Sequence, residues 1–584
     1  MLSYNVTILQ GAEPTFEHDK KYELTEEDKK RILKEGKIVS TNVTRRRERG
    51  EILIGDTYLF PIAQTSMGMM LGRVEKSRAG NRILAFRGIR HVKPPVGELR
   101  FKPPVEAPSW KGLVELKANG HVCPQHLAHK ADTWVGDEDC LWLNVFTRDL
   151  DDKKQRPVIV WIHGGNFNKG SAAEYGPEYL LDEDVVLVTI QYRLGIFGFL
   201  STESSAAPGN YGMHDQVAAL KWVKRNIAAF SGDPDMVTIM GQQAGGASVH
   251  YHILSPITRE LFNRGVSLSG SALCWWASIK RPQEKAQKLA RLVDCPNGDM
   301  EKLIACLREQ SVLDLMNTLP NFYQWKHLEQ NQEPMTAWSP RVDPEVDIDA
   351  GHLSFMPQEP IDIMKSGKFQ RTSWLTGITD DEGATRASAF FADEAGVKEF
   401  EEKFEKYGPL MFGLDDGQSE APMMNAKKVK DHYFGDKISP YNLVDAISDS
   451  SYAHPLETAA EIHAKNGVKV YLYHFGYRGT HSHAHIRPNV DPPTLFQPST
   501  EYGVGNGDDL IYLFPIHPSL FTLNQEEENF SKSFVELLMS FVKKGVPKWG
   551  SGLEWTPVNV TSVLFNQLNI GNVVEMDKGL PNRK

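Results

Sequence analysis

Gly241 and Gly245 flank Gln243 in a short segment that joins an apolar run to a helix-forming stretch. A strand, a Gly-x-?-x-Gly turn and a helix together form the sharp elbow that presents a nucleophile at a helix N-terminus. The central residue here is Gln243, and a carboxamide has no nucleophilic oxygen that a base could activate. The residues therefore predict that covalent acyl transfer does not begin at this turn.

The elements around this turn have the pattern of strands separated by helices. The first two strands are predicted from continuous apolar runs and the later ones from shorter strand-like segments. The helices are predicted from an apolar stripe at helical spacing or from their place after the turn. Strands are expected at 157–162, 185–192, 235–240, 266–268, 374–376 and 470–475, and helices at 215–230 and around 247–250. Strands that alternate with helices predict an α/β fold, with a large, mostly parallel central sheet and helices on both faces.

Length, composition and charge exclude several classes of protein. The chain has 584 residues, 41% of them hydrophobic, and a formal charge of −10, which is ordinary globular composition. We expect no nucleic acid partner, because the chain has no net positive charge to hold a polyanion. No apolar run reaches the roughly 20 residues that span a bilayer, so no transmembrane segment is predicted. Residues 1–64 read as a charged, poorly ordered arm, and residues 65–584 as one domain.

Long ordered segments resemble the type-B carboxylesterases, the cholinesterase-like branch of the α/β-hydrolases. The segments that carry the resemblance are Phe86-Arg87-Gly88-Ile89, Pro94 to Phe101, Glu138 to Val145, Gly209-Asn210-Tyr211-Gly212, Asp215 to Leu220, and Phe230 to Pro234. They belong to a stretch of similarity from about residue 67 to about residue 567. The resemblance implies the α/β-hydrolase fold.

The resemblance also implies positions for the catalytic groups. Its oxyanion hole corresponds to the backbone N–H groups of Gly164, Gly165 and Ala244, all of which are retained. Its acid corresponds to Glu382, in Asp381-Glu382-Gly383. Its histidine, in a segment such as G-V-x-H-G-D-D-L, corresponds to Asn506. The triad is therefore expected to be degenerate, with Gln243 and Asn506 in place of the nucleophile and the base.

Three hypotheses of function follow. The first is a non-catalytic carboxylesterase-like protein that binds another protein, with a role such as cell adhesion, as in neurotactin, gliotactin and glutactin. The second is a carrier or sensor of a lipophilic ester or acid, which the retained oxyanion hole would hold. The third is an active carboxylic ester hydrolase with a relocated triad, for which Ser248, Ser269 and Ser271 are the candidate nucleophiles.

The cysteines and glycosylation sequences bear on the cellular compartment. Cys123 and Cys140 lie 17 residues apart and Cys295 and Cys306 lie 11 apart, so each pair could close a short loop. The alternative is five reduced cysteines, with Cys274 a buried thiol in either case. Candidate glycosylation sites are Asn5, Asn42, Asn529 and Asn559. These features favour an extracellular protein; the absence of a visible export signal in the first residues leaves a cytoplasmic location as the alternative.

No cofactor and no metal are predicted. His481, His483 and His485 alternate, but no cysteine or carboxylate at ligand spacing accompanies them, so an exposed polar loop is the interpretation. Phe534, Leu537, Leu538 and Phe541 form a helical stripe that is expected to face the core. A homodimer built on this C-terminal helix stays open as an alternative.

Overall fold

A computed structural model describes most of the chain. The described residues are 40–41, 58–59, 61–127, 130–151, 153–322, 338–344, 353–414, 421–435, 437–486, 500–516, 520–550, 553–559, 565–569 and 572–576. Most of the predicted N-terminal arm lies outside these residues, as do the sequons at Asn5 and Asn42.

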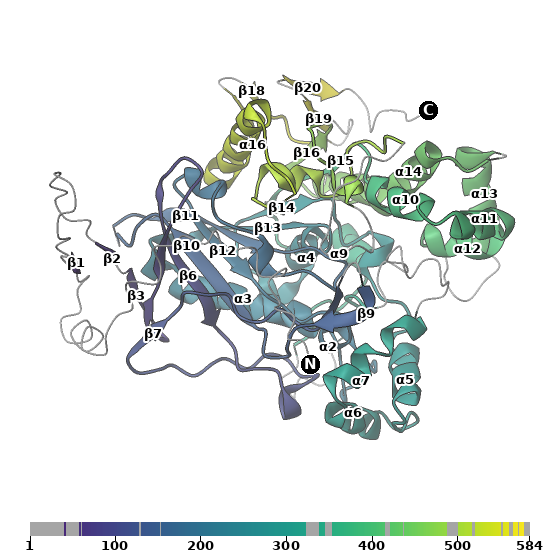
Figure 1. Cartoon of the computed structure of the whole chain (residues 1–584), viewed down its shortest axis with the longest axis horizontal. Coiled ribbons are helices and arrows are strands. Elements are labelled where there is room, and N and C mark those ends of the chain that lie inside the picture. Colours follow the sequence, from purple (N-terminus) through teal and green to yellow (C-terminus); the bar gives the residue numbers. More distant parts are fainter. Residues whose placement is uncertain are drawn as a thin grey trace, which may run out of the picture.

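An 11-stranded sheet forms the centre of the molecule (Figure 1). Its strand order is β20-β19-β16-β15-β14-β13-β11-β12-β10-β6-β5, and the seven strands from β19 to β12 run parallel to their neighbours. Antiparallel strands complete both edges. The parallel strands are β11 (Arg156–Ile162), β12 (Val186–Ile190), β13 (Gly232–Gln242), β14 (Arg264–Leu268), β15 (Ser373–Thr379), β16 (Val470–Phe475) and β19 (Phe565–Asn569). The edge strands are β5 (Arg73–Lys76), β6 (Arg82–Arg90), β10 (Trp142–Thr147) and β20 (Asn572–Met576).

Alternate side chains of the central strands enter two separate hydrophobic cores. In β11, Val158, Val160 and Ile162 join the larger core, whereas Ile159 and Trp161 join the second core on the opposite face. This division follows from the two-residue period of a strand, which turns successive side chains to opposite faces. A strand that is apolar at every position is therefore buried on both sides, as the continuous apolar runs of the sequence predicted.

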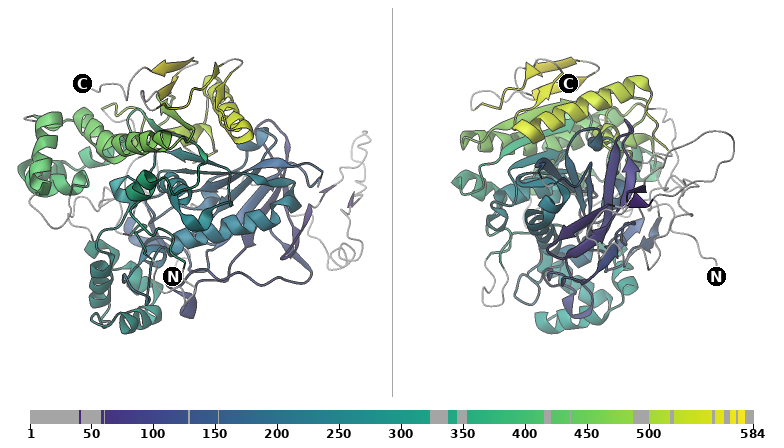
Figure 2. Two further views of the ribbon diagram at one scale, coloured as in Figure 1. Left: turned by 180° about the vertical axis from the view of Figure 1, so that it is seen from behind. Right: turned by 90° about the vertical axis from the view of Figure 1, so that its left-hand side faces the viewer.

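Helices cover both faces of the sheet (Figure 2). Residues of α3 (Tyr211–Asn226), α4 (Ala244–Leu254) and α15 (His454–Lys465) pack in the larger core, and α16 (Gln525–Lys544) packs in the second. Two further groups of helices lie on the right in Figure 1, one at the bottom and one above it. The first group is α5 (Pro282–Leu292), α6 (Met300–Glu309) and α7 (Val312–Met316). The second is α10 (Ala384–Phe391), α11 (Glu394–Glu402), α12 (Phe404–Met411), α13 (Ala421–Val429) and α14 (Pro440–Ser448).

The fold prediction is confirmed in its class and in its central elements. Each predicted parallel strand corresponds to one of β11 to β16, and the two predicted helices correspond to α3 and α4. The stripe of α16 faces the core as expected, because Phe534, Leu537, Leu538 and Phe541 are all buried. The assignment of residues 65–584 to one domain stays a prediction. Within the described residues, no helix is long and apolar enough to cross a bilayer.

Both predicted disulfides are present. Cys123 is joined to Cys140 and Cys295 to Cys306, and Cys274 is a buried thiol. The second bridge ties the end of α5 to α6, at the periphery of the molecule.

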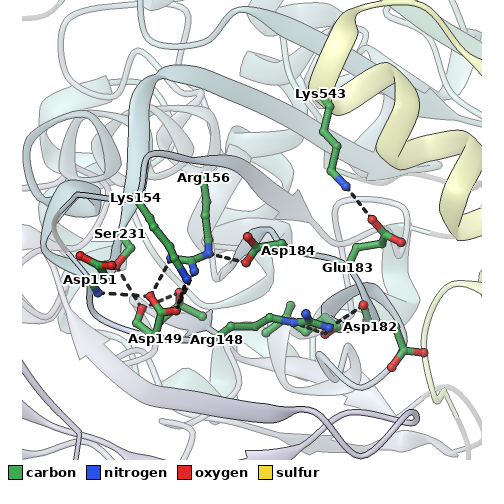
Figure 3. Close-up of polar contacts among 12 residues, drawn as sticks. Arg148, Asp149, Asp151, Lys154, Arg156, Asp182, Glu183, Asp184, Ser231 and Lys543 are labelled. Carbon is green, nitrogen blue, oxygen red and sulfur yellow. Dashed lines mark hydrogen bonds and ion pairs between the residues drawn. The ribbon is translucent and has the colours of Figure 1, made fainter.

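A network of ion pairs connects the turn before β11 with the segment before β12 and with α16 (Figure 3). The buried Arg156 side chain pairs with Asp149 at 2.8 Å and with Asp184 at 2.5 Å, and Lys543 of α16 pairs with Glu183 at 2.6 Å. These contacts join the ends of β11 and β12 to α16, and they stabilise the frame that carries the site.

Candidate functional site

Gln243 occupies the tip of the sharp turn between β13 and α4. Its backbone has φ 53° and ψ −110°, in the left-handed range of φ that side chains other than glycine adopt rarely. Its N–H donates to Leu268 O at 2.8 Å, which fastens the turn to the end of β14. The predicted strand–turn–helix elbow is therefore present, and Gln243 is its central residue.

Glycines make this turn possible because the backbone segments approach too closely for a side chain. A Cβ at Gly245 would lie 2.0 Å from Ile162 O, and one at Gly241 would lie 2.5 Å from Gly245 C. A Cβ at Gly270 would lie 2.1 Å from Gln243 O. The backbone of the elbow is thus enclosed on several sides, so the position of its amide groups is fixed by the surrounding strands.

Three backbone N–H groups converge on the side-chain oxygen of Gln243. Oε1 accepts from Ala244 at 2.8 Å, from Asn166 at 2.9 Å and from Gly165 at 3.2 Å. The amide nitrogen of the same side chain donates to Asn166 Oδ1. The carboxamide is therefore bonded at both ends, and only 4% of Gln243 is exposed.

The three donors differ by one residue from the predicted set of Gly164, Gly165 and Ala244. Gly165 and Ala244 belong to the converging group, and Asn166 donates where Gly164 was expected. Asn166 has φ 56°, in the left-handed range. Sequence reasoning missed this residue, although it directly follows His163-Gly164-Gly165 and asparagine tolerates the left-handed conformation better than most residues.

Glu382 and Asn506 lie side by side, as the resemblance implied. Asn506 Nδ2 donates to Glu382 Oε2 at 2.6 Å, and Glu382 Oε1 accepts from Thr379 N at 2.9 Å. Gln242 Nε2 donates to Asn506 Oδ1 at 2.8 Å. A chain of hydrogen bonds thus runs from the acid through Asn506 to the residue before the elbow. Gln242 was not predicted, and nothing in the sequence pattern marked it.

Burial dominates the electrostatics of Glu382, which is 1% exposed. Loss of water, with a smaller contribution from the nearby Asp509, raises the pKa of its carboxyl group to a net value of about 7. Hydrogen bonds from Ser269, Asn506 and Thr379 oppose this shift, because they favour the charged carboxylate. The Glu382 carboxyl group therefore changes charge near neutral pH.

The alternative serines are buried in the interior. Ser248 Oγ donates to Ala244 O at 2.8 Å, inside α4, and accepts from Gln216 Nε2 at 3.2 Å. Ser269 and Ser271 are likewise buried, and Ser269 lies close enough to Glu382 to lower the pKa of its carboxyl group. The hydroxyl of Ser248 is thus engaged inside α4 rather than at the tip of the elbow.

The remaining predicted positions in the described residues are two sequons and the alternating histidines. Asn529 is exposed on α16 and Asn559 is exposed after β18 (Leu553–Glu554). His483 Nδ1 lies 3.1 Å from Asp508 Oδ1, and His481 stacks on Phe521. Among the described residues, no group of three or more histidines, cysteines and carboxylates is placed to hold a metal ion.

The sheet, the glycine-flanked elbow and the neighbouring acid together define an α/β-hydrolase, and the chain belongs to the carboxylesterase family, whose model matches residues 60–583. Esterase FE4 of Myzus persicae is 34% identical over 511 residues, covering 85% of this chain and 87% of that protein. Juvenile hormone esterase of Tribolium castaneum is also 34% identical, over 520 residues, covering 85% and 86%.

A solved structure gives the same result for the fold. The crystal structure of juvenile hormone esterase from Manduca sexta, with OTFP covalently attached, has a TM-score of 0.78 and 26% sequence identity. The match covers 89% of this chain and 97% of the juvenile hormone esterase chain. The α/β-hydrolase fold predicted from the sequence is therefore confirmed.

The hypothesis of a non-catalytic protein is contradicted by these comparisons. The relatives that cover most of the chain are named esterases, and another is a carboxylic ester hydrolase of Bombus ignitus, 31% identical over 529 residues. None of these relatives indicates a role in cell adhesion or as a carrier or sensor, and the resemblance to inactive members is not shown. Two side chains, Gln243 and Asn506, are too narrow a basis for the function of the whole chain.

Proposed function

We propose that this chain hydrolyses carboxylic esters at the elbow around Gln243, by direct attack of water rather than through an acyl-enzyme. The observation that carries the proposal is the convergence of the Gly165, Asn166 and Ala244 N–H groups on one carbonyl oxygen, at 2.8 to 3.2 Å. This is the geometry that stabilises the oxyanion of a tetrahedral intermediate. The relatives named as esterases support the same reaction class.

The reaction balances without a protein nucleophile. Water adds to the ester carbonyl carbon, and the carbonyl oxygen takes the negative charge while the three N–H groups donate to it. The proton of the attacking water passes to solvent. When the tetrahedral intermediate collapses, the bond to the alcohol oxygen breaks, and the departing alkoxide takes a proton from solvent. The products are a carboxylic acid and an alcohol.

The residues at the triad positions support this route over a covalent one. Gln243 offers an amide where a hydroxyl would attack, and Asn506 offers an amide where an imidazole would carry the proton. We therefore propose that Gln243, Glu382 and Asn506 form a degenerate triad. Binding and oxyanion stabilisation without a triad give about 10³-fold acceleration over water, so slow turnover is expected.

Hydrolysis of 4-nitrophenyl butyrate by the purified chain, before and after treatment with a fluorophosphonate, tests the proposal. We expect a rate above that of buffer that fluorophosphonate leaves unchanged, since the elbow presents Gln243 rather than an activated serine. Mass spectrometry of the treated protein should show no adduct. Loss of activity together with a stoichiometric phosphonyl adduct on any residue, or a rate equal to that of buffer, would overturn the proposal.

We also propose that the chain works in an oxidising compartment outside the cytosol. The two disulfides support this, because such bridges are rare where thiols are kept reduced. The exposed Asn529 and Asn559 are the sequons that a glycosylating compartment could modify among the described residues. Peptide mapping of the chain secreted from eukaryotic cells would detect glycans at these two positions.

A further inference from the structure

Gln243 fills its own oxyanion hole. Its side-chain carbonyl satisfies all three converging donors, and its amide nitrogen is tied to Asn166 Oδ1. A bound ester needs the same three donors for its own carbonyl oxygen. The carboxamide and an incoming ligand therefore compete for one set of hydrogen bonds.

The three donors are backbone N–H groups held by the fold, whereas the competing carboxamide belongs to a side chain. The donors belong to backbone enclosed by Ile162 O, Gly245 C and neighbouring atoms at distances that leave no space for a Cβ at Gly241 or Gly245. The carboxamide sits at the end of a side chain with several rotatable bonds, so it can leave without movement of that backbone. Removing the side chain should leave the three N–H groups aimed at the same point.

We infer that Gln243, tied to Asn166, is a built-in competitor that a carboxylate or a carboxylic ester must displace in order to bind the elbow. The inference rests on the proposed function, since it concerns the same three donors. A competitor of this kind lowers the apparent affinity of a ligand by the fraction of time that the site is open. The ligand class is a carboxylic acid, as its anion or its ester, because its oxygen matches the donors and a helix N-terminus favours negative charge.

Calorimetric titration with octanoate tests the competition apart from turnover. Gln243→Ala removes the competing carboxamide, and we expect octanoate to bind this variant at least about tenfold more tightly than the native chain. Asn166→Gly keeps the backbone N–H and tolerates the φ of 56°, but removes the tie to the Gln243 side chain. An intermediate gain in affinity is expected for this second variant, which also serves if Gln243→Ala does not fold.

Gln242→Ala is the matched control. It removes the adjacent carboxamide, which donates to Asn506 and not to the hole, so the affinity for octanoate should stay within about twofold of the native value. Equal affinities in the native chain, Gln243→Ala and Asn166→Gly would overturn the inference. Failure of octanoate to bind any of them at millimolar concentration would overturn it as well.

Turnover separates this inference from the proposed function. If Gln243→Ala gains affinity for octanoate but neither it nor the native chain hydrolyses 4-nitrophenyl butyrate, the competitor is supported and the proposed function fails. If the native chain hydrolyses the ester and Gln243→Ala gains no affinity, the proposed function stands and the competitor is refuted.

Discussion

Gln243 at the elbow and Asn506 beside Glu382 are the two side chains that distinguish the degenerate triad we propose for this member of the carboxylesterase family. The backbone around them keeps the converging N–H groups, and Glu382 keeps a hydrogen-bonded neighbour in Asn506. What the site lacks is a hydroxyl at position 243 and an imidazole at position 506. Because Asn506 already lies 2.6 Å from the acid, an imidazole in its place would begin next to its orienting partner.

Combined replacement of both residues should create a covalent route. We expect Gln243→Ser with Asn506→His to raise hydrolysis of 4-nitrophenyl butyrate at least about tenfold, since nucleophile and base act as a unit. The double variant should also take up one equivalent of fluorophosphonate, measured by intact mass. Each single variant should show a smaller rise in hydrolysis and less uptake of fluorophosphonate, because it has either the nucleophile without the base or the base without the nucleophile.

Glu382→Gln in the double variant is the control for that gain. Replacing the carboxylate removes the charge that stabilises an imidazolium, so most of the gained activity should disappear. A double variant that reacts no faster than the native chain would show that the segment around position 506 does not bring an imidazole to the elbow.

At the scale of elements, a pair of buried histidines joins α4 to α15. His250 Nδ1 accepts the Ala272 N–H at 3.1 Å, so its proton is on Nε2, which lies 2.9 Å from His463 Nε2. His250 also stacks on Trp374 of β15. Burial lowers the pKa of His463 to about 3 and that of His250 well below its usual range, and each ring is neutral in the folded protein.

This pair of neutral histidines makes the free energy of unfolding depend on pH in the acid range. The unfolded chain binds protons at these residues below about pH 6.5, whereas the folded chain does not, so the pair lowers stability progressively as pH falls below that value. We expect His463→Gln to reduce the loss of unfolding free energy between pH 6.5 and pH 4 by up to about 1.4 kcal/mol per pH unit. Urea unfolding at several pH values measures the slope.

His454→Gln, at an exposed position at the start of α15, is the matched control for that slope. Parallel pH profiles for the native chain and His463→Gln would contradict the assignment of a neutral, buried pair.

At the scale of the whole molecule, two disulfides close short loops, one in the larger core and one between α5 and α6. Cys123–Cys140 spans 17 residues before β10, and Cys295–Cys306 spans 11 residues between α5 and α6. Crosslinks of this length restrict the unfolded chain, which favours the folded state. The stability of the folded state therefore depends on whether the two disulfides are oxidised, as well as on the packing of the hydrophobic cores.

Removing either bridge by paired Cys→Ser substitution should lower the free energy of unfolding by about 3 kcal/mol, from the closure entropy of loops of this length. Urea unfolding of Cys123→Ser with Cys140→Ser, and of Cys295→Ser with Cys306→Ser, measures the two losses. Reduction of the native chain should lower its urea midpoint, and Cys274→Ala provides a control in which both bridges remain. Unchanged midpoints would show that the bridges add little to the folded state.

The sequence by itself determined the sheet, the elbow and the absence of a nucleophile there. Near-continuous apolar runs marked strands such as β11 and β12, because strands buried on both faces carry mostly apolar side chains. Glycines at 241 and 245 marked the elbow because its backbone approaches its neighbours too closely for a Cβ. These are local requirements, and they can be read from residue types and spacing alone.

Only the tertiary structure decided which atoms meet at the site. Gln242 and Gln243 lie at the end of β13, whereas their partners Asn506 and Asn166 come from distant parts of the chain. The hydrogen bonds of Gln242 with Asn506 and of Gln243 with Asn166 depend on side-chain directions that spacing does not encode. An amide can donate and accept, so residue type left open whether Gln243 would point outward or into the hole. The enclosing backbone resolved this, because it places three donors within reach of that one carbonyl oxygen.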